Sequence, residues 1–372
     1  SSASGSGGVT LAGNGGGEVG GSGGSAGLGG SAGSAGSAGQ GGSATSACSV
    51  SATDADQPKL LSATGCVDMA DPAKPAPGLV PYAVNSPLWS DGAVKERFVS
   101  IPQGEKIHVL DCAVEPTKCV DTGLGGSGGD DGHWQMPIGT VLVKNFSVKD
   151  QRIETRLFMR RSETAWRGFS YEWNDAETEA TLLPEDKDRQ LNGQVWHYPS
   201  RGQCLECHTK AGGRSLGPTT AQMNADFAYA DGSMNQLAKF QELGLFDVAP
   251  KTIPAYPDPY GAAGTLEQRA RSYLQTNCAT CHRPGGEFGA VDMRFTTDFA
   301  DMKLCNEPSE RDTGIVPEFR LVPTKPDESA LSFRMHASFA SNVRMPKVGS
   351  NVVDTPGVTL IDAWITGITA CP

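Results

Sequence analysis

The sequence predicts a multidomain β + α protein, in which an antiparallel β domain precedes two small α-helical segments. Residues 48–200 contain short runs rich in β-branched and aromatic residues, separated by turn signals. After this point the apolar spacing becomes helical. The pattern Cys-x-x-Cys-His then occurs twice, at residues 204–208 and 278–282. The β-rich part therefore precedes two segments that carry the same chemical signature.

The N-terminal segment, residues 1–47, is almost wholly Gly, Ser and Ala, with Glu18 as its only charge. Such a stretch has too little apolar surface to offset its ordering entropy, so it is predicted to be a disordered tether. We expect an exported chain whose signal has been removed, and a lipidated cysteine before Ser1 is one possibility. No apolar run approaches the roughly 18 residues that span a bilayer, so no transmembrane segment is predicted.

The β domain is predicted to extend over residues 48–200, as an antiparallel sandwich or partly closed barrel. Its clearest strands are expected at residues 138–146, 152–160, 167–173 and 194–198. The second of these strands alternates polar and apolar side chains, as a strand with one buried face does.

The two helical segments are predicted at residues 201–262 and 263–372, and each contains one copy of the cysteine motif. Helices are expected at residues 237–243, 266–274 and 358–365. The second of these helices runs directly into the second motif.

The repeated motif is a haem-attachment signal. Its two thiols, three positions apart, can each add to a vinyl group of a haem, and the histidine that follows becomes the proximal iron ligand. A four-thiolate zinc site is the alternative, but zinc does not explain why a histidine follows both cysteine pairs. We therefore predict two covalently attached haem c groups. The predicted haem-binding residues are Cys204, Cys207, His208, Cys278, Cys281 and His282.

The second haem segment resembles a class I cytochrome c domain. A helix leads into the motif, a long loop carries Met345-Pro346, and a closing helix contains Trp364. In that family a Met followed by Pro supplies the sixth iron ligand. The resemblance therefore implies His282 as proximal and Met345 as distal ligand of haem 2. Met335 and His336 on the same segment are the rival candidates.

The sixth ligand of haem 1 is less defined by the sequence. His208 is the predicted proximal ligand, and Met223 is the favoured distal ligand because it follows a turn that resembles the one after the motif in many small cytochromes. An open iron position is a further alternative, and it would permit haem chemistry beyond electron transfer. The other candidate ligands are Met234, His197, His108, His133, Met136 and Met159.

The remaining cysteines indicate an exported protein. Of 10 cysteines, four belong to the motifs, and the even remainder suggests three disulfides. Sequence proximity favours Cys48 with Cys66 and Cys112 with Cys119, which leaves Cys305 for Cys371. The net charge of -11 argues against nucleic acid or an anionic membrane as a partner. A redox protein with a basic docking patch suits this charge better.

Several separate motifs, in order along residues 80–372, resemble a bacterial family of diheme c-type cytochromes with an N-terminal β domain. They include residues 86–92, 137–144, 171–174 and 198–201. The resemblance implies a periplasmic or cell-surface protein that accepts electrons from a dehydrogenase, for example a quinoprotein. The family has Gln-Leu-Asn where this chain has Gln222-Met223-Asn224, which weakens the case for Met223 as a necessary ligand.

Electron transfer between two haems is accordingly the first functional hypothesis, and it requires no catalytic residue. The second hypothesis is a diheme enzyme of peroxidase type with one open haem, for which His133 and His197 are the candidate acid-base residues. The third hypothesis makes the β domain a binding module that tethers the cytochrome. Its aromatic candidates are Trp89, Trp134, Trp166, Trp173 and Trp196.

Overall fold

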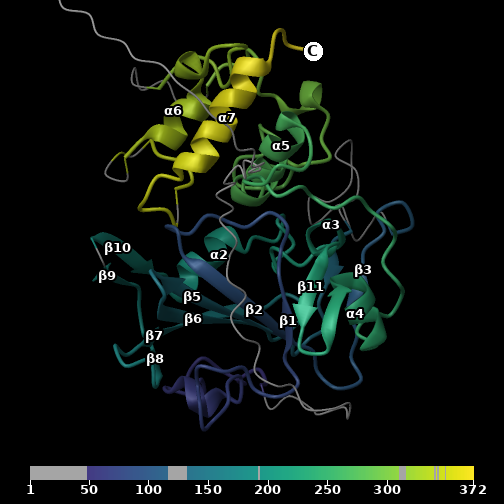
Figure 1. The fold of residues 1–372 in the computed structure, drawn as a ribbon, viewed down its shortest axis with the longest axis vertical. Coiled ribbons are helices and arrows are strands. Elements are labelled where there is room, and N and C mark those ends of the chain that lie inside the picture. The colour runs from purple at the N-terminus through teal and green to yellow at the C-terminus, as the bar shows by residue number, and fades with distance from the viewer. Residues whose placement is uncertain are drawn as a thin grey trace, which may run out of the picture. The chain divides into compact units, whose positions relative to one another are not determined.

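A six-stranded antiparallel sheet lies in the N-terminal half of the computed structural model, and several helices follow in the C-terminal part (Figure 1). The structure describes residues 48–115, 132–191, 193–309, 316–338, 341, 343–347 and 349–372, all within one compact unit. The strand order of the sheet is β1-β2-β5-β6-β7-β8. These strands are β1 (Val80–Tyr82), β2 (Val94–Ser100), β5 (Val141–Val148), β6 (Gln151–Arg160), β7 (Trp166–Trp173) and β8 (Ala180–Leu182).

The three central strands lie close to where the sequence predicts strands. The alternation expected to mark one buried face does not hold for β6, because apolar clusters cover residues of both its faces. The strands expected at residues 152–160 and 167–173 begin one residue earlier in the structure. The strand expected at 138–146 is displaced toward the C-terminus, as β5. Alternate residues point to opposite faces of a strand, and one face of the sheet packs against an apolar core. That core includes Val143, Leu157, Phe169, Tyr171 and Trp173.

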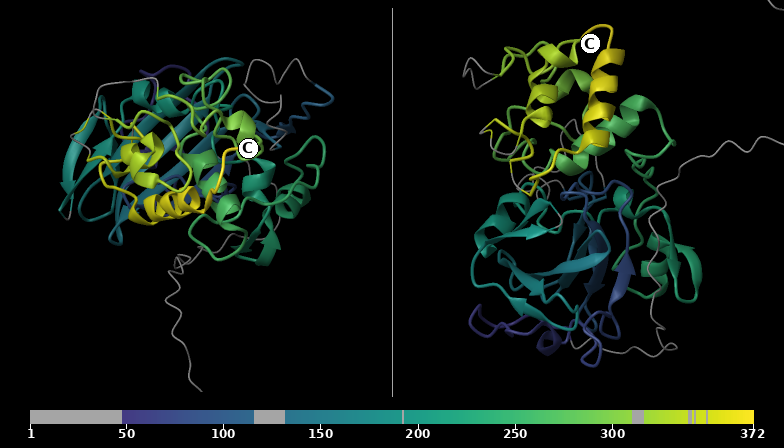
Figure 2. Two further views of the ribbon diagram at one scale, coloured as in Figure 1. Left: turned by 90° about the horizontal axis from the view of Figure 1, so that it is seen from above. Right: turned by 60° about the vertical axis from the view of Figure 1, so that its left-hand side comes forward.

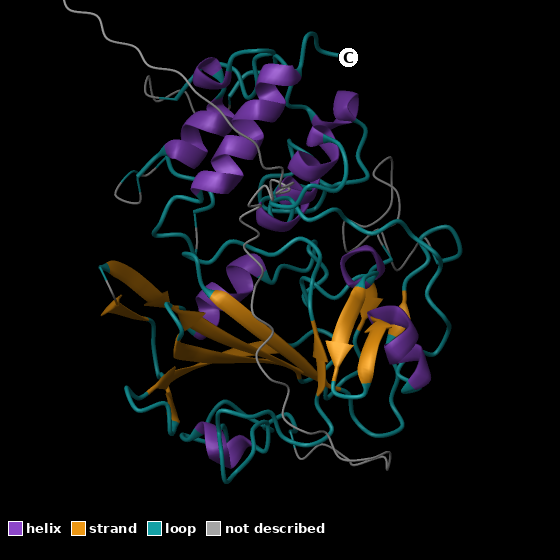
Figure 3. Cartoon of the chain, in the orientation of Figure 1, coloured by secondary structure: helices purple, strands orange, loops and turns teal. Residues whose placement is uncertain are grey.

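The other strands that the structure describes form two-stranded ribbons. The β domain therefore has one open sheet with small ribbons, where a sandwich or partly closed barrel was predicted (Figure 3). The strand expected at residues 194–198 is confirmed, but it pairs only with the strand before it. The ribbons are β3 (His108–Val109) with β4 (Trp134–Gln135), β9 (Lys187–Leu191) with β10 (Gln194–Tyr198), and β11 (Asp226–Tyr229) with β12 (Gly232–Asn235).

The helices lie mainly after residue 200, and the C-terminal ones group together, apart from the strands, in the right-hand view of Figure 2. Their apolar core includes Tyr273 and Trp364, and every helix expected from the sequence is present. The helices are α2 (Arg201–Cys207), α3 (Thr220–Met223), α4 (Gln236–Glu242), α5 (Leu266–Asn277), α6 (Ala330–His336) and α7 (Thr355–Gly367), with short 3-10 turns at Leu61–Thr64, Phe299–Met302 and Pro326–Glu328. None of the helices described is long and apolar enough to cross a membrane.

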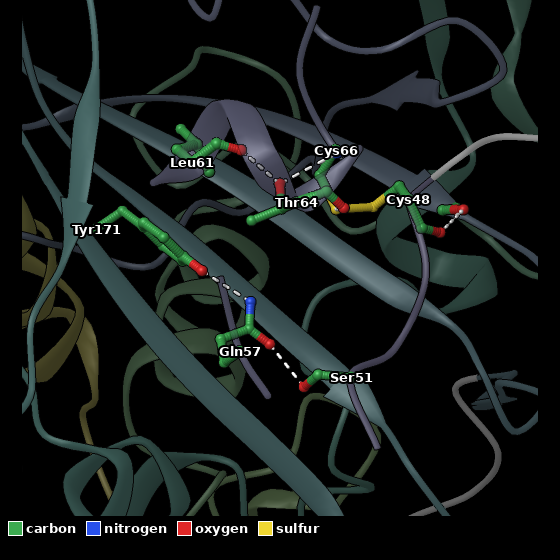
Figure 4. Close-up of a disulfide and its surroundings, with 8 residues drawn as sticks. Cys48, Ser51, Gln57, Leu61, Thr64, Cys66 and Tyr171 are labelled. Atoms are coloured by element: carbon green, nitrogen blue, oxygen red, sulfur yellow. Dashed lines mark hydrogen bonds between the residues drawn. A yellow bond between two sulfur atoms is a disulfide. The ribbon is translucent and has the colours of Figure 1, made fainter. Parts of the chain in front are cut away.

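Two of the predicted disulfides are confirmed, Cys48–Cys66 and Cys305–Cys371. Cys112 is also disulfide-bonded, while its predicted partner Cys119 lies outside the described residues. The first disulfide holds the N-terminal loop on the apolar face of the sheet (Figure 4). There the Gln57 side chain donates a 2.7 Å hydrogen bond to the Tyr171 hydroxyl of β7.

Candidate functional site

Both cysteine motifs line one cavity of about 500 Å³. All six predicted haem-binding residues are among its lining residues, although the motifs are far apart in the sequence. The cavity walls come from the β sheet, from the segment around α2, and from the helical part that contains α5. The structure therefore brings together two segments that the sequence predicted as separate haem sites.

Helix α2 positions the first pair of thiols. It begins with a capping box, in which Ser200 accepts from the Gln203 backbone amide and the Gln203 side chain accepts from the Ser200 amide. Residues three positions apart lie on one face of a helix, so Cys204 and Cys207 lie on the same face of α2. The helix ends at Cys207, and His208 follows as its C-cap.

Gly168 of β7 provides the space into which Cys204 fits. A Cβ atom at position 168 would lie 2.6 Å from the Cys204 Sγ and 2.8 Å from its Cβ. Both distances are too short for a real contact, so a side chain at position 168 would displace the Cys204 thiol. The choice of glycine in the middle of a strand, where it weakens the strand, is thus explained by the docking of α2.

Replacing Gly168 by Ala is expected to lower covalent haem content at the first motif by at least about half, because the crowded thiol is displaced. Mass spectrometry of the two motif peptides would measure each site separately. Gly202→Ala in α2 is the matched control, since its Cβ would meet only the Ser200 Oγ, at 3.9 Å. Full haem attachment at the first motif of Gly168→Ala would contradict this explanation.

The His208 imidazole is held as a neutral metal ligand would be. Its Nδ1 donates a 2.5 Å hydrogen bond to the backbone carbonyl of Arg214, and the Phe158 ring lies 3.9 Å away, between ring centroids. Burial lowers the pKa of His208 to about 3. Because Nδ1 carries the proton, Nε2 keeps its lone pair for a metal. The geometry therefore fits His208 as a proximal ligand.

The second motif begins at the C-cap of α5, whereas the cysteines of the first motif lie within α2. Helix α5 also begins with a capping box, from Thr265 and Gln268, and the amide of His282 donates to the carbonyl of Cys278 at 3.0 Å. The His282 ring stacks on Phe288, with ring centroids 5.4 Å apart. Two capped helices thus present the two motifs to the cavity.

Met345 lines the same cavity as His282. Its neighbour Arg344 holds the loop, because the guanidinium donates to the carbonyls of Ser350 and Val352 at 3.0 and 2.9 Å. The rival candidates lie elsewhere. Met335 is buried in the apolar core of the helical part, and His336 pairs with Asp362 at 2.8 Å. Of the three candidates, Met345 alone is among the residues that line the cavity.

Met223 is fully buried in an apolar cluster with Trp134 and Phe240. It does not belong to the residues that line the cavity, whereas its neighbour Gln222 does. The Gln222 side chain accepts from the Ser86 amide and donates to Thr276. The geometry thus gives Met223 a packing role and provides no support for it as a ligand of haem 1.

The other candidates for the distal ligand of haem 1 divide into residues that line the cavity and residues that do not. Four of them do not line the cavity. Met136 and Met159 are buried in apolar clusters, and Met234 is 38% exposed on β12. The His108 ring lies between the carboxylates of Glu115 and Asp247, at 2.6 Å from each. His133 and His197 are the two predicted candidates that line the cavity. His133 hydrogen-bonds to the Gly213 carbonyl at 3.2 Å, and His197 bonds to Asp188 and Gln203.

The two motif segments contact each other directly. The Thr280 hydroxyl donates to the Cys207 carbonyl at 2.5 Å, and the Thr209 hydroxyl donates to the Thr280 carbonyl at 3.1 Å. In addition, Arg283 donates to the Ala211 carbonyl at 3.1 Å. No pattern in the sequence predicts these contacts, because they depend on how segments distant in the chain fold together.

The four motif cysteines fit thioether formation better than a zinc site. They are free thiols, and the other cysteines in the described parts of the chain are disulfide-bonded. Within the ranges that the structure describes, no group of three or more His, Cys, Asp or Glu side chains converges to hold a metal ion. A four-thiolate zinc site requires such convergence. Each motif instead offers two free thiols followed by a histidine, which is the donor set that a covalent haem would use.

Most of the tryptophans considered for a binding module in the β domain are buried. Four of them are at most 5% exposed, namely Trp134, Trp166, Trp173 and Trp196. Trp89 is half-buried, and its indole nitrogen donates to the Val352 carbonyl at 2.9 Å. Trp89 and Trp196 also line the cavity that contains the two motifs, while the other three rings pack in the interior.

No protein-family model, curated protein or solved structure matches the chain in the three comparisons.

Proposed function

We propose that this protein is an exported diheme c-type cytochrome that transfers electrons between a redox partner and a further acceptor. Haem c supplies a reversible one-electron iron couple when bound. The observation that carries the proposal is the meeting of two Cys-x-x-Cys-His motifs at one cavity, with hydrogen bonds between the motif segments themselves. The resemblance of the sequence to diheme cytochromes with an N-terminal β domain agrees with it.

The contact between the motifs supports electron transfer from one haem to the other. Electron tunnelling weakens steeply with distance, so a diheme carrier benefits from attachment sites that lie side by side. The Thr280 hydroxyl donates to the Cys207 carbonyl, and the Thr280 carbonyl accepts from the hydroxyl of Thr209, which directly follows the first motif. This arrangement keeps the two attachment sites in a fixed relation, which limits reorganisation when an electron arrives.

The C-terminal part, residues 263–372, is proposed to be a class I cytochrome c domain with His282 and Met345 as its axial ligands. Its supporting features are the helix that leads into the motif, the Met345 loop at the cavity and the closing helix α7. The thioether of Met345 would favour ferrous iron. We expect haem 2 to have a higher reduction potential than a haem with two histidine ligands.

An acidic chain of net charge -11 favours a partner with a basic docking surface. A periplasmic or surface dehydrogenase, for example a quinoprotein, is the proposed electron donor, by resemblance. The disulfides agree with an oxidising compartment, in which haem attachment to free thiols also takes place.

The proposal predicts that both haems are six-coordinate and that the ferrous protein binds carbon monoxide slowly or not at all. Optical and EPR spectra of the purified protein measure the coordination, and a redox titration should resolve two one-electron steps. Rapid carbon monoxide binding together with peroxide turnover by a reduced donor would favour the peroxidase-type enzyme instead. In that case His133 and His197 at the cavity would become the acid-base candidates.

A further inference from the structure

A short segment of the β domain, residues 86–91, contacts the helix that leads into the second motif. The segment lies between β1 and β2, and five of its six residues line the cavity. The backbone amide of Trp89 donates to the side-chain oxygen of Asn277 at 2.8 Å. Asn277 is buried, ends α5 and directly precedes Cys278. The segment is therefore fixed to the residue that adjoins the second motif.

The same segment also holds the loop that carries Met345, and it does so at one residue, Val352. The Asp91 carboxylate accepts from the Val352 backbone amide at 2.8 Å, and the Trp89 indole nitrogen donates to the Val352 carbonyl at 2.9 Å. In Figure 1 the chain just before α7, which contains Val352, runs toward the strands. Both backbone polar groups of Val352 are thus paired with the β domain.

A buried arginine connects Val352 to Met345. Arg344 is 6% exposed and directly precedes Met345. Its guanidinium donates to the Val352 carbonyl at 2.9 Å and to the Ser350 carbonyl at 3.0 Å. A carbonyl oxygen has two lone pairs, so that of Val352 can accept from both Trp89 and Arg344. The neighbour of Met345 and the β domain therefore meet at a single carbonyl group.

The backbone of the segment is shaped for these contacts. Asp91 has a φ of 52° and Gly92 a φ of 75°, so two successive residues adopt the left-handed conformation. Aspartate and asparagine adopt this conformation more readily than most other residues. Asp91 is also only 5% exposed, so water does not readily replace its bond to Val352.

We propose that Trp89 and Asp91 are positioning residues that hold Met345 on the iron of haem 2. This inference rests on the proposed function, because it requires a haem at the second motif. The two residues fix the spacing between the helix that ends beside Cys278 and the loop that carries Met345. Groups that orient a metal ligand from behind affect how firmly the metal keeps it. The β domain thereby controls the coordination of haem 2.

The test is carbon monoxide binding by the haem-loaded, ferrous, full-length protein and its Trp89→Phe and Asp91→Gly variants. Carbon monoxide binds haem 2 only after Met345 dissociates, so the rate of the kinetic phase that Met345→Ala accelerates reports the open fraction. Loss of one hydrogen bond should raise this rate about fivefold in each variant, and further in the double variant. The far-red absorption band of the iron–methionine bond in the ferric protein should weaken in parallel.

The substitutions are chosen to change little besides these hydrogen bonds. Phenylalanine at position 89 keeps an aromatic ring and lacks the indole N–H, and glycine at position 91 adopts the left-handed backbone without strain. Asp91→Asn keeps both a side-chain oxygen that accepts and a residue suited to this conformation, so its rate should stay close to that of the parent.

Trp173→Phe is the matched control. It removes a 2.9 Å hydrogen bond from an indole nitrogen to the Thr155 hydroxyl, in the core of the same domain and away from the cavity. Its carbon monoxide rate should equal that of the parent even where its stability falls as much as that of Trp89→Phe. This comparison separates positioning of the ligand from general destabilisation.

The outcomes separate this proposal from the proposed function. Rates in Trp89→Phe and Asp91→Gly that match the rate in Trp173→Phe overturn the positioning role and leave the function intact. A parent protein with fewer than two covalent haems contradicts the function itself, and a Met345→Ala variant that binds carbon monoxide no faster than the parent contradicts the ligand. Either result overturns the positioning role as well. If Asp91→Gly does not load haem, the rate in Trp89→Phe decides.

Discussion

Replacing Cys204 and Cys207 together by Ser is expected to reduce the covalent haem content from two haems per chain to one. A hydroxyl lacks the nucleophilicity of a thiolate and does not form the thioether bonds that attach a haem. The double replacement of Cys278 and Cys281 should give the same number but retain the other haem. Intact mass under denaturing conditions, after extraction of any non-covalent haem, gives the count.

The matched control for both variants is Cys305→Ser with Cys371→Ser, which removes two cysteines of the second disulfide instead. This control should keep both haems. Opening the disulfide loop, whose cysteines are 66 residues apart, should lower the free energy of unfolding by roughly 4 kcal/mol. A haem count that does not fall in either motif variant would refute attachment at these thiols. Stoichiometric zinc in the unmodified protein would favour the four-thiolate alternative.

Local features of the fold could be predicted from the sequence because they depend on near neighbours. The strand at residues 152–160 followed from its alternating side chains, and the helix into the second motif followed from its apolar spacing. Two disulfides followed from proximity and elimination. The arrangement of the strands was less accessible, since the same strand pattern suits a sandwich, a barrel or an open sheet.

The site was predictable only where its chemistry lies in one short segment. The motif residues could be named from their spacing, and Met345 from the resemblance to class I cytochromes c, and all of them line the cavity. Met223 was favoured because of the turn before it, yet burial in an apolar cluster decides its placement. The sequence did not predict that Arg97, Lys144 and Arg156 lie opposite one another on three neighbouring strands, because this depends on the register between the strands.

Replacing Met345 by Ala is expected to open the sixth position of haem 2. Met345 is the only one of the three candidates on its segment that lines the cavity, and alanine provides no donor atom. The ferrous protein should then bind carbon monoxide at one haem. The potential of that haem should fall by on the order of 0.2 V, a part of the roughly 0.8 V range that axial ligands span. A redox titration and carbon monoxide difference spectra measure both effects.

The rivals on the same segment supply the controls. Met335→Ala removes a side chain that is 4% exposed in the core, so it should lower the free energy of unfolding by about 2–5 kcal/mol while the haem spectrum stays unchanged. His336→Ala removes an exposed hydrogen bond to Asp362 and should alter neither property appreciably. Carbon monoxide binding in Met335→Ala or His336→Ala, but not in Met345→Ala, would assign the ligand to a rival. Because stability and coordination change in different variants, a spectral change at position 345 alone identifies a bond to iron rather than a general loosening of the fold.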